Sequence, residues 1–328
     1  MTVEIGIPGV AVGHATDPTL GSGVTAIVFD AAAVAAVMVL GGAPGGRDTD
    51  LLAPENSIER VDALVLSGGS AFGLDAPGGV QAALREAGRG FEIRGIRVPL
   101  VPGAILFDLA NGGNKDWGRF SPYRDLGYAA ATAASHRPVA EGSVGAGTGA
   151  TTATVKGGFG CASETTAAGH RVTALIAVNA AGAPTVGEGR WFWAAPFERD
   201  REFGGLGWPS GMPPDAHALR TKGTRIPSTT IGAVVTDTAL TRPQAKRLAI
   251  MAHDGLARAV LPAHAPMDGD TIFAASTGAR RLNDPVGELT ALGHAAAIAV
   301  ARAIGRGVYA AAALPVPGAQ ASWRDRFG

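Results

Sequence analysis

The stretch Pro227-Ser228-Thr229-Thr230-Ile231-Gly232-Ala233-Val234-Val235-Thr236 leads from a polar loop directly into a β-branched, apolar run. Such residues favour strands, and a run that is apolar on both faces indicates a strand covered on each side. Taken alone, a hydroxyl residue at this boundary is most often just the start of a strand. The alternative is a self-processing site, in which the Thr229 hydroxyl attacks the Ser228 carbonyl and water cleaves the ester. The new terminus would then carry a nucleophile beside an α-amine that titrates at about 7.7–8.0.

Apolar runs and helical patterns alternate on both sides of this stretch. The expected strands are residues 25–29, 35–40, 63–67, 97–101, 172–178 and 230–236. The expected helices are residues 71–87, residues 126–135, a helix from the N-cap Thr241 that stops before Pro262, and residues 287–304. Residues 187–228 are rich in Pro, Gly, Trp and charge, and include the basic run 220–225, so we expect a surface excursion there. The alternation predicts one layered α/β domain over residues 1–328.

The bulk composition of the 328 residues excludes several classes of protein. Hydrophobic residues make up 46% of the chain, which is ample material for a large core. The 28 basic and 28 acidic side chains cancel, which argues against nucleic-acid binding and against disorder. The N-terminus has no signal-peptide pattern, and the apolar run 31–40 is about half the length that spans a bilayer. We therefore expect a cytoplasmic protein with no membrane or nucleic-acid partner.

Two carboxylates flank a glycine in Asp268-Gly269-Asp270. Such a sequence is typical of an ordinary turn. The alternative is that both acids point into a site and hold a cationic amine or a hydroxyl. A divalent metal needs further oxygen ligands, and none stands nearby, while the seven histidines show no ligand spacing. We therefore expect no metal and no other cofactor.

Glycine-rich segments and two polar residues complete the candidates. Residues 66–75 follow a strand and open a helix, but they match neither dinucleotide nor P-loop motifs, so they predict close packing that also lines a pocket at Ser70. Residues 142–150 precede Lys156, whose apolar setting would depress its pKa if it were buried, although a surface lysine is the default. Asn179 ends a predicted strand, where asparagine forms turns or donates to an oxyanion.

In their order, these segments resemble the P1 family of self-processing aminopeptidases, the L-aminopeptidase/D-esterase family that includes the nylon-oligomer hydrolases. The matching stretches span nearly the whole chain, and they are residues 13–17, 41–49, 66–76, 101–109 and 145–156, the Thr229 strand and the Asp268-Gly269-Asp270 turn. The resemblance implies a four-layer αββα sandwich similar to N-terminal-nucleophile hydrolases. It also implies cleavage between Ser228 and Thr229 into fragments 1–228 and 229–328 that stay associated, in a homo-oligomer that is expected to be a tetramer.

The resemblance also assigns roles to single residues. Thr229 matches the nucleophile, and the matching site residues of the nylon-oligomer branch are Lys156, Asn179, Asp268 and Asp270. That branch has Asn where this chain has Ser228, and some members have Tyr where it has Phe107, which we expect in the substrate pocket. The implied mechanism uses the Thr229 α-amine as base, Asn179 for the oxyanion, Lys156 to keep the amine neutral, and the two aspartates to orient Thr229.

The substrate remains open at this point. Small peptides, amino-acid amides and 6-aminohexanoate oligomers are all compatible with such a site, and the threonine nucleophile with its Asp-Gly-Asp turn favours the nylon-type branch. An acyl transferase would use the same nucleophile with an amine acceptor. A non-catalytic relative would bind a small ligand with its glycine loops and would stay uncut.

Overall fold

The computed structural model describes residues 1–223 and 227–328, so the end of the basic run 220–225 lies outside the described residues. Its large sheet contains β10 (Gly158–Thr165), β11 (Arg171–Val178), β12 (Ile231–Thr238), β13 (Thr271–Arg280), β3 (Ser22–Val39), β5 (Arg60–Ser67), β8 (Gly103–Ile105) and β4 (Gly46–Arg47), with β2 (Val10–Asp17) also paired to β3. Two short pairs join β1 (Thr2–Val3) to β9 (Val139–Ala140) and β6 (Phe91–Ile93) to β7 (Ile96–Val98). The helices are α1 (Ala76–Glu86), α2 (Tyr123–Thr132), α3 (Arg242–Ala259), α4 (Gly287–Ala310) and α5 (Trp323–Phe327).

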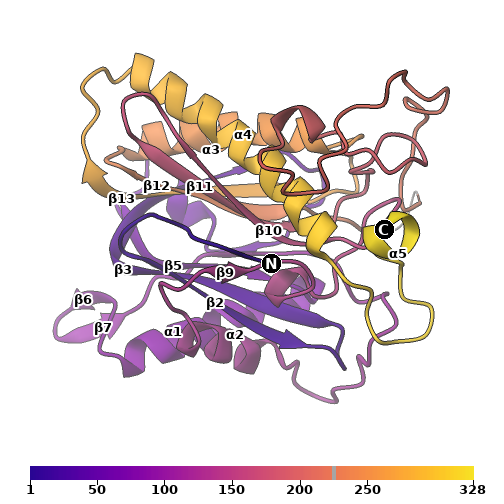
Figure 1. Cartoon of the computed structure of the whole chain (residues 1–328). Helices are drawn as coiled ribbons and strands as arrows, with labels where there is room; N and C mark the ends of the chain where they lie inside the picture. Colours follow the sequence, from indigo (N-terminus) through magenta and orange to yellow (C-terminus); the bar gives the residue numbers. More distant parts are fainter. Residues whose placement is uncertain (224–226) are drawn as a thin grey trace.

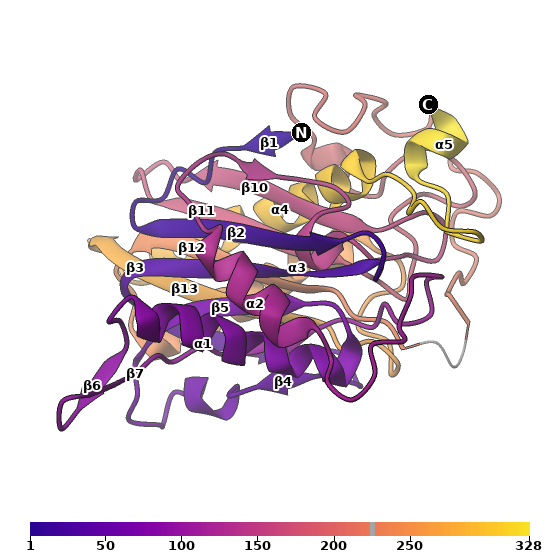
Figure 2. The same cartoon turned by 90° about the horizontal axis from the view of Figure 1, so that it is seen from below.

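The long strand β3 belongs to two layers of the molecule. Its first half pairs with β2 and β5, and its second half pairs with β13. The sheet therefore divides into one layer, β10-β11-β12-β13, and a second layer, β2-β3-β5-β8-β4, which lie face to face in Figure 1. Helices α3 and α4 cover the first layer, while α1 and α2 cover the second (Figures 1 and 2).

Three hydrophobic clusters fill the three spaces between these four layers. One lies between α3, α4 and the first sheet layer, and includes Leu248, Val300 and Ile176. A second lies between the two sheet layers, and a third joins α1 and α2 to the second layer. Burial on both faces explains why these strands are apolar throughout. Among the described residues, no helix is long and apolar enough to cross a membrane.

Most expected elements are confirmed, and the differences have simple causes. Helix α3 begins after Thr241, whose side chain forms a capping box with Gln244. The expected strands 25–29 and 35–40 are one strand, because the more exposed residues 30–32 between them lie where β3 passes from one layer to the other. Strands β2, β10 and β13 were not predicted, since their Gly, Ala and Ser residues carry little strand propensity. The expected strand 97–101 is reduced to the short β7.

One edge of the first sheet layer collects the candidate residues. Strand β11 ends at Val178, opposite the first residues of its antiparallel neighbours β10 and β12. Strand β13 runs parallel to β12 and begins beside it. Asn179 therefore follows β11 at the same edge where Lys156, Thr229 and Asp270 stand just before β10, β12 and β13.

Candidate active site

The peptide bond between Ser228 and Thr229 is buried and tightly held. Thr229 is only 3% exposed, and its backbone N–H donates to the carbonyl oxygen of Asn179 at 2.9 Å. The Thr229 hydroxyl donates to the carbonyl oxygen of Ser228, to which it lies very close. The same carbonyl oxygen accepts the backbone N–H of Gly269 at 2.9 Å. A hydroxyl nucleophile and an N–H donor therefore meet at one peptide carbonyl.

The turn Asp268-Gly269-Asp270 is buried, unlike an ordinary surface turn. Asp270 accepts the Thr230 N–H at 2.8 Å through Oδ1, and its Oδ2 lies 2.8 Å from Nδ1 of His264. Asp268 accepts the backbone N–H groups of Ala181 and Ala265 at 3.0 and 3.1 Å. Burial, together with the neighbouring Asp270 carboxylate, raises the pKa of Asp268 to about 6. The Asp270 carboxylate thus holds the backbone just after Thr229, while the Asp268 carboxylate holds two other segments, at Ala181 and Ala265.

The Asn179 side chain lies fully buried between three segments. Its Oδ1 accepts the Thr151 N–H at 2.9 Å and the Lys222 ammonium at 3.0 Å, while its Nδ2 donates to the Phe107 carbonyl at 3.0 Å. Because both neighbours of Oδ1 are donors, the orientation of the amide is determined by its partners. Asn179 therefore presents its N–H groups toward Phe107, where one of them is available to an oxyanion.

Lys156 is buried, so the default interpretation of a surface lysine is wrong. Its ammonium donates to the carbonyl oxygens of Gly147 and Gly157 at 3.1 and 2.9 Å. Burial lowers the pKa of Lys156 to about 7, and the carboxylate of Asp108 acts weakly in the opposite direction. The glycine-rich stretch before β10 thus folds around this amine, and Lys156 can exist as a neutral or a charged group near pH 7.

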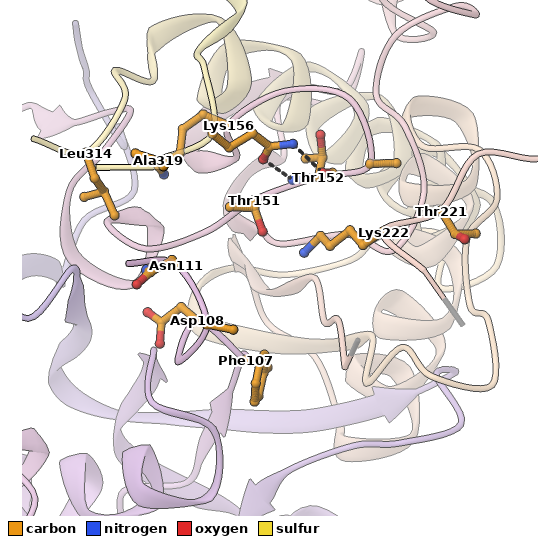
Figure 3. Close-up of a pocket in the computed structure, with 14 residues that line it drawn as sticks. Phe107, Asp108, Asn111, Thr151, Thr152, Lys156, Thr221, Lys222, Leu314 and Ala319 are labelled. Atoms are coloured by element: carbon orange, nitrogen blue, oxygen red, sulfur yellow. Dashed lines mark hydrogen bonds between the residues drawn. The ribbon is translucent and has the colours of Figure 1, made fainter. Parts of the chain in front are cut away.

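A cavity of about 450 Å³ opens beside these residues (Figure 3). Phe107, Thr151, Lys156 and Lys222 are among its lining residues, and that this cavity is the substrate pocket stays a prediction. Ser70 is not one of the lining residues, because it stands at the start of a short helical turn (Ser70–Asp75), where its N–H donates to the Leu106 carbonyl. Asn179 and Thr229 are not among the lining residues, but Asn179 links them to the cavity: its side chain contacts Phe107, Thr151 and Lys222, and its carbonyl accepts the Thr229 N–H.

Three groups at the site were missed by the sequence reasoning. The first is Lys222, whose pKa is lowered to about 7 by burial and which stands in the expected surface excursion. The second is Asp108, which accepts hydrogen bonds from the Ser22 hydroxyl at 2.6 Å and from the Gly69 N–H at 2.8 Å. Burial raises the pKa of Asp108. The third is the Gly269 N–H. All three stand in stretches that the sequence analysis had named, namely 101–109, 220–225 and the Asp268-Gly269-Asp270 turn, but no pattern marked these particular groups. In the described part of the chain, no cluster of three His, Cys, Asp or Glu could hold a metal.

Comparison with known sequences identifies relatives along the whole chain. A family model described as peptidase family S58 matches residues 5–321. An uncharacterized aminopeptidase of Mycobacterium tuberculosis strain H37Rv is 42% identical, and the match covers 98% of this chain and 96% of that protein. A 6-aminohexanoate-oligomer endohydrolase of Kocuria sp. is 28% identical, with coverage of 84% and 75%.

Solved structures show the same architecture. A β-aminopeptidase of Burkholderia sp. superposes with a TM-score of 0.69 at 24% identity, covering 98% of this chain and 91% of that one. An L-aminopeptidase D-Ala-esterase/amidase of Ochrobactrum anthropi, described as a variant of the Ntn hydrolase fold, gives 0.68 at 21% identity, covering 96% and 88%. These likenesses concern the fold, and they confirm the predicted αββα class.

Proposed function

The chain belongs to peptidase family S58 and is a hydrolase of peptide or amide bonds, and on that premise we propose that it cuts itself before Thr229 and then uses Thr229 as an N-terminal nucleophile. The observation that carries the proposal is the buried Ser228–Thr229 bond, with the Thr229 hydroxyl against its carbonyl and the Gly269 N–H on its oxygen. An ordinary strand start needs neither of these contacts.

The proposed self-cleavage begins as an acyl shift. The Thr229 oxygen bonds to the Ser228 carbonyl carbon, and negative charge develops on the carbonyl oxygen, which the Gly269 N–H stabilises from 2.9 Å. The C–N bond then breaks, and the hydroxyl proton goes to the nitrogen, which becomes the Thr229 amine. Water hydrolyses the ester, leaving a carboxylate on Ser228 and a free hydroxyl on Thr229.

The same groups would serve the mature enzyme. The α-amine of Thr229 acts as general base for its own hydroxyl, which attacks the substrate carbonyl. Departure of the Ser228 carbonyl frees the Gly269 N–H, so this donor and the Asn179 amide can both receive the substrate oxyanion. Asp270 holds the backbone next to Thr229, Asp268 holds the segment at Ala181, and Lys156 supplies a buried positive charge beside the cavity. Water then hydrolyses the acyl-enzyme.

For the substrate we propose small peptides, amino-acid amides or 6-aminohexanoate oligomers, in line with the names of the relatives. The cavity of about 450 Å³ suits a small molecule rather than a folded protein. A panel of aminoacyl-p-nitroanilides and 6-aminohexanoate oligomers separates the two classes. Hydrolysis of only the anilides would indicate an aminopeptidase, and cleavage within the oligomers would indicate an endo-hydrolase.

The test of the proposal is intact mass with N-terminal sequencing of the purified wild-type and Thr229→Ala proteins. We expect two wild-type fragments, of which the smaller starts at Thr229, and one uncut, inactive Thr229→Ala chain. Thr229→Ser keeps a hydroxyl and should still be cut. A wild-type chain that stays whole for days, or an active Thr229→Ala protein, contradicts the proposal.

We also propose that the processed units form a homo-oligomer, expected to be a tetramer, in the cytoplasm. Light scattering of the cut protein tests the oligomer, and cell fractionation tests the location. A monomer in solution would leave the chemistry unaffected, since every group named above comes from one chain.

A further inference from the structure

We propose that Lys222 is the positioning residue that keeps the freed α-amine of Thr229 unprotonated, by standing beside it on the same carbonyl oxygen. This inference rests on the proposed cleavage before Thr229. It differs from the role that the family resemblance assigns to Lys156, whose ammonium is directed to the carbonyls of Gly147 and Gly157.

The argument starts from a shared acceptor. The backbone nitrogen of Thr229, which becomes the α-amine, lies 2.9 Å from the carbonyl oxygen of Asn179. The Lys222 Nζ lies 3.1 Å from that oxygen and 3.0 Å from Oδ1 of the same residue. Two nitrogens bound to one oxygen at these lengths are at most about 6 Å apart, which is the range in which like charges shift each other's pKa.

Lys222 is held by contacts that do not depend on the peptide bond that is cut. Its backbone N–H donates to the Ala181 carbonyl at 3.1 Å. Two residues earlier, the Arg220 guanidinium pairs with Asp215 at 2.6 Å. Both partners belong to the fragment that ends at residue 228, so the ammonium keeps its place after cleavage.

The two amines compete for a proton, and Lys222 is the more basic. A lysine titrates at about 10.4 in peptides and an α-amine at about 7.7–8.0. Burial lowers the pKa of Lys222 to about 7. Thr229 is less exposed than Lys222, so we expect burial to lower the pKa of the α-amine as well and to preserve the order. The pair therefore holds its proton on Lys222, and a second proton on Thr229 is opposed by charge repulsion.

Other charged groups face this pair and set its background. Asp268 attracts the Lys222 ammonium, Lys156 repels it, and Asp108 attracts it from the far side of the cavity. Asp270, with His264 behind it, faces the Thr230 N–H next to the new amine. Removal of Lys222 would raise the pKa of the α-amine because a repelling charge is lost. The carboxylates that remain would raise this pKa as well, so both effects have the same sign.

The experiment measures the α-amine directly by its reaction with cyanate, which modifies only the unprotonated form. The cut wild-type enzyme and the Lys222→Met, Lys222→Arg and Lys246→Met variants are labelled across a pH series. The small fragment also holds Lys246, its one lysine, so the rate at Thr229 is read from the mass of the N-terminal peptide released from that fragment by digestion. Lys246 is a matched control, since its pKa is also lowered by burial while it binds the Val37 carbonyl. The acid limb of kcat/KM is recorded on the same samples.

We expect the wild-type α-amine to titrate below the peptide range of about 7.7–8.0. Lys222→Met should raise this value by about one pH unit or more and move the acid limb of kcat/KM equally, so that kcat/KM well below both limbs falls about tenfold relative to the wild type. Lys222→Arg and Lys246→Met should leave both unchanged. A cut Lys222→Met enzyme with an unshifted α-amine overturns the inference while the proposed function stands.

If the Lys222→Met chain is never cut, the titration of the α-amine in the wild-type enzyme and in Lys222→Arg decides the test. A wild-type α-amine that titrates at or above about 7.7 then overturns the inference. Absence of any wild-type cleavage removes the α-amine itself and defeats the proposed function instead, so the two failures are distinguishable.

Discussion

The buried ammonium of Lys156 should make the stability of the chain depend on pH above neutrality. Its pKa is about 7 in the folded chain, against 10.5 when exposed. The folded state therefore binds fewer protons than the unfolded state between these values, and the free energy of unfolding rises with pH in this window. The cost of burying the charge is fully present below pH 7 and vanishes above about pH 10.5, and it amounts to about 4–5 kcal/mol.

Lys156→Met removes this dependence while it keeps most of the packing. The variant also deprives the Gly147 and Gly157 carbonyls of a donor, at about 1–3 kcal/mol each, so the change in stability at one pH has two opposing parts. The slope of the unfolding free energy against pH reflects only one of these parts, the titration of Lys156. Between about pH 7.5 and 9.5, the reference chain should gain about 2.5 kcal/mol relative to the variant.

The assay is urea unfolding followed by fluorescence at several pH values. Both proteins carry Thr229→Ala, so that one uncut chain unfolds in each case. The part of the lowered Lys222 pKa that is due to burial is common to both and cancels in the difference, whereas the repulsion by Lys156 is lost in the variant together with Lys156 itself. Parallel curves of unfolding free energy against pH for the two proteins would refute the assignment of a buried, easily deprotonated Lys156.

Two further predictions test the surroundings of the site. Gly269→Ala should slow self-cleavage at least tenfold, because the added Cβ would lie 2.8 Å from the Thr229 hydroxyl, whereas Gly211→Ala meets nothing within 4 Å and should be cut normally; the intact mass over time decides this, and equal rates contradict it. Arg302→Met should lower the free energy of unfolding by about 3–5 kcal/mol, because Glu164 and Glu202, which it contacts at 2.7 Å, lose a buried partner. Urea unfolding of the uncut chain measures the second effect, and a loss under about 1 kcal/mol would contradict it.

The fold was largely predictable because burial on both faces of a strand leaves a clear trace. Runs such as 174–178 and 231–235 are apolar without interruption, and the capping signal at Thr241 marks the start of α3 without ambiguity. Strand β10 leaves no such trace, because two of its glycines pack against the backbone of α4: a Cβ on Gly160 would lie 1.9 Å from the Ala303 carbonyl. Close packing of this kind replaces side chains with backbone contacts, which hydrophobic patterns do not record.

The candidate site was predictable only where residues stand at element boundaries. Thr229 and the Asp268-Gly269-Asp270 turn precede strands and were singled out together, and the parallel pairing of β12 with β13 brings them into contact. Lys222 lies in a polar loop that is held by the ion pair of Arg220 and by the Ala181 carbonyl. No local sequence pattern predicts that a lysine in such a loop points inward. Its direction depends on tertiary contacts alone.

The strand order β11-β12-β13-β3 has a consequence for how a cut protein could be rebuilt. A break before Thr229 would leave β12 and β13 in the small fragment. On either side, these strands would stay hydrogen-bonded to β11 and β3 of the large fragment. Separating them means opening two ladders at once, so the assembled pair would persist. Reassembly from unfolded pieces would need two molecules to meet and interleave, whereas the first folding needed only one. The continuous chain would then assist folding only once, before it is cut. The mature protein would persist because it unfolds slowly, and not because it refolds readily.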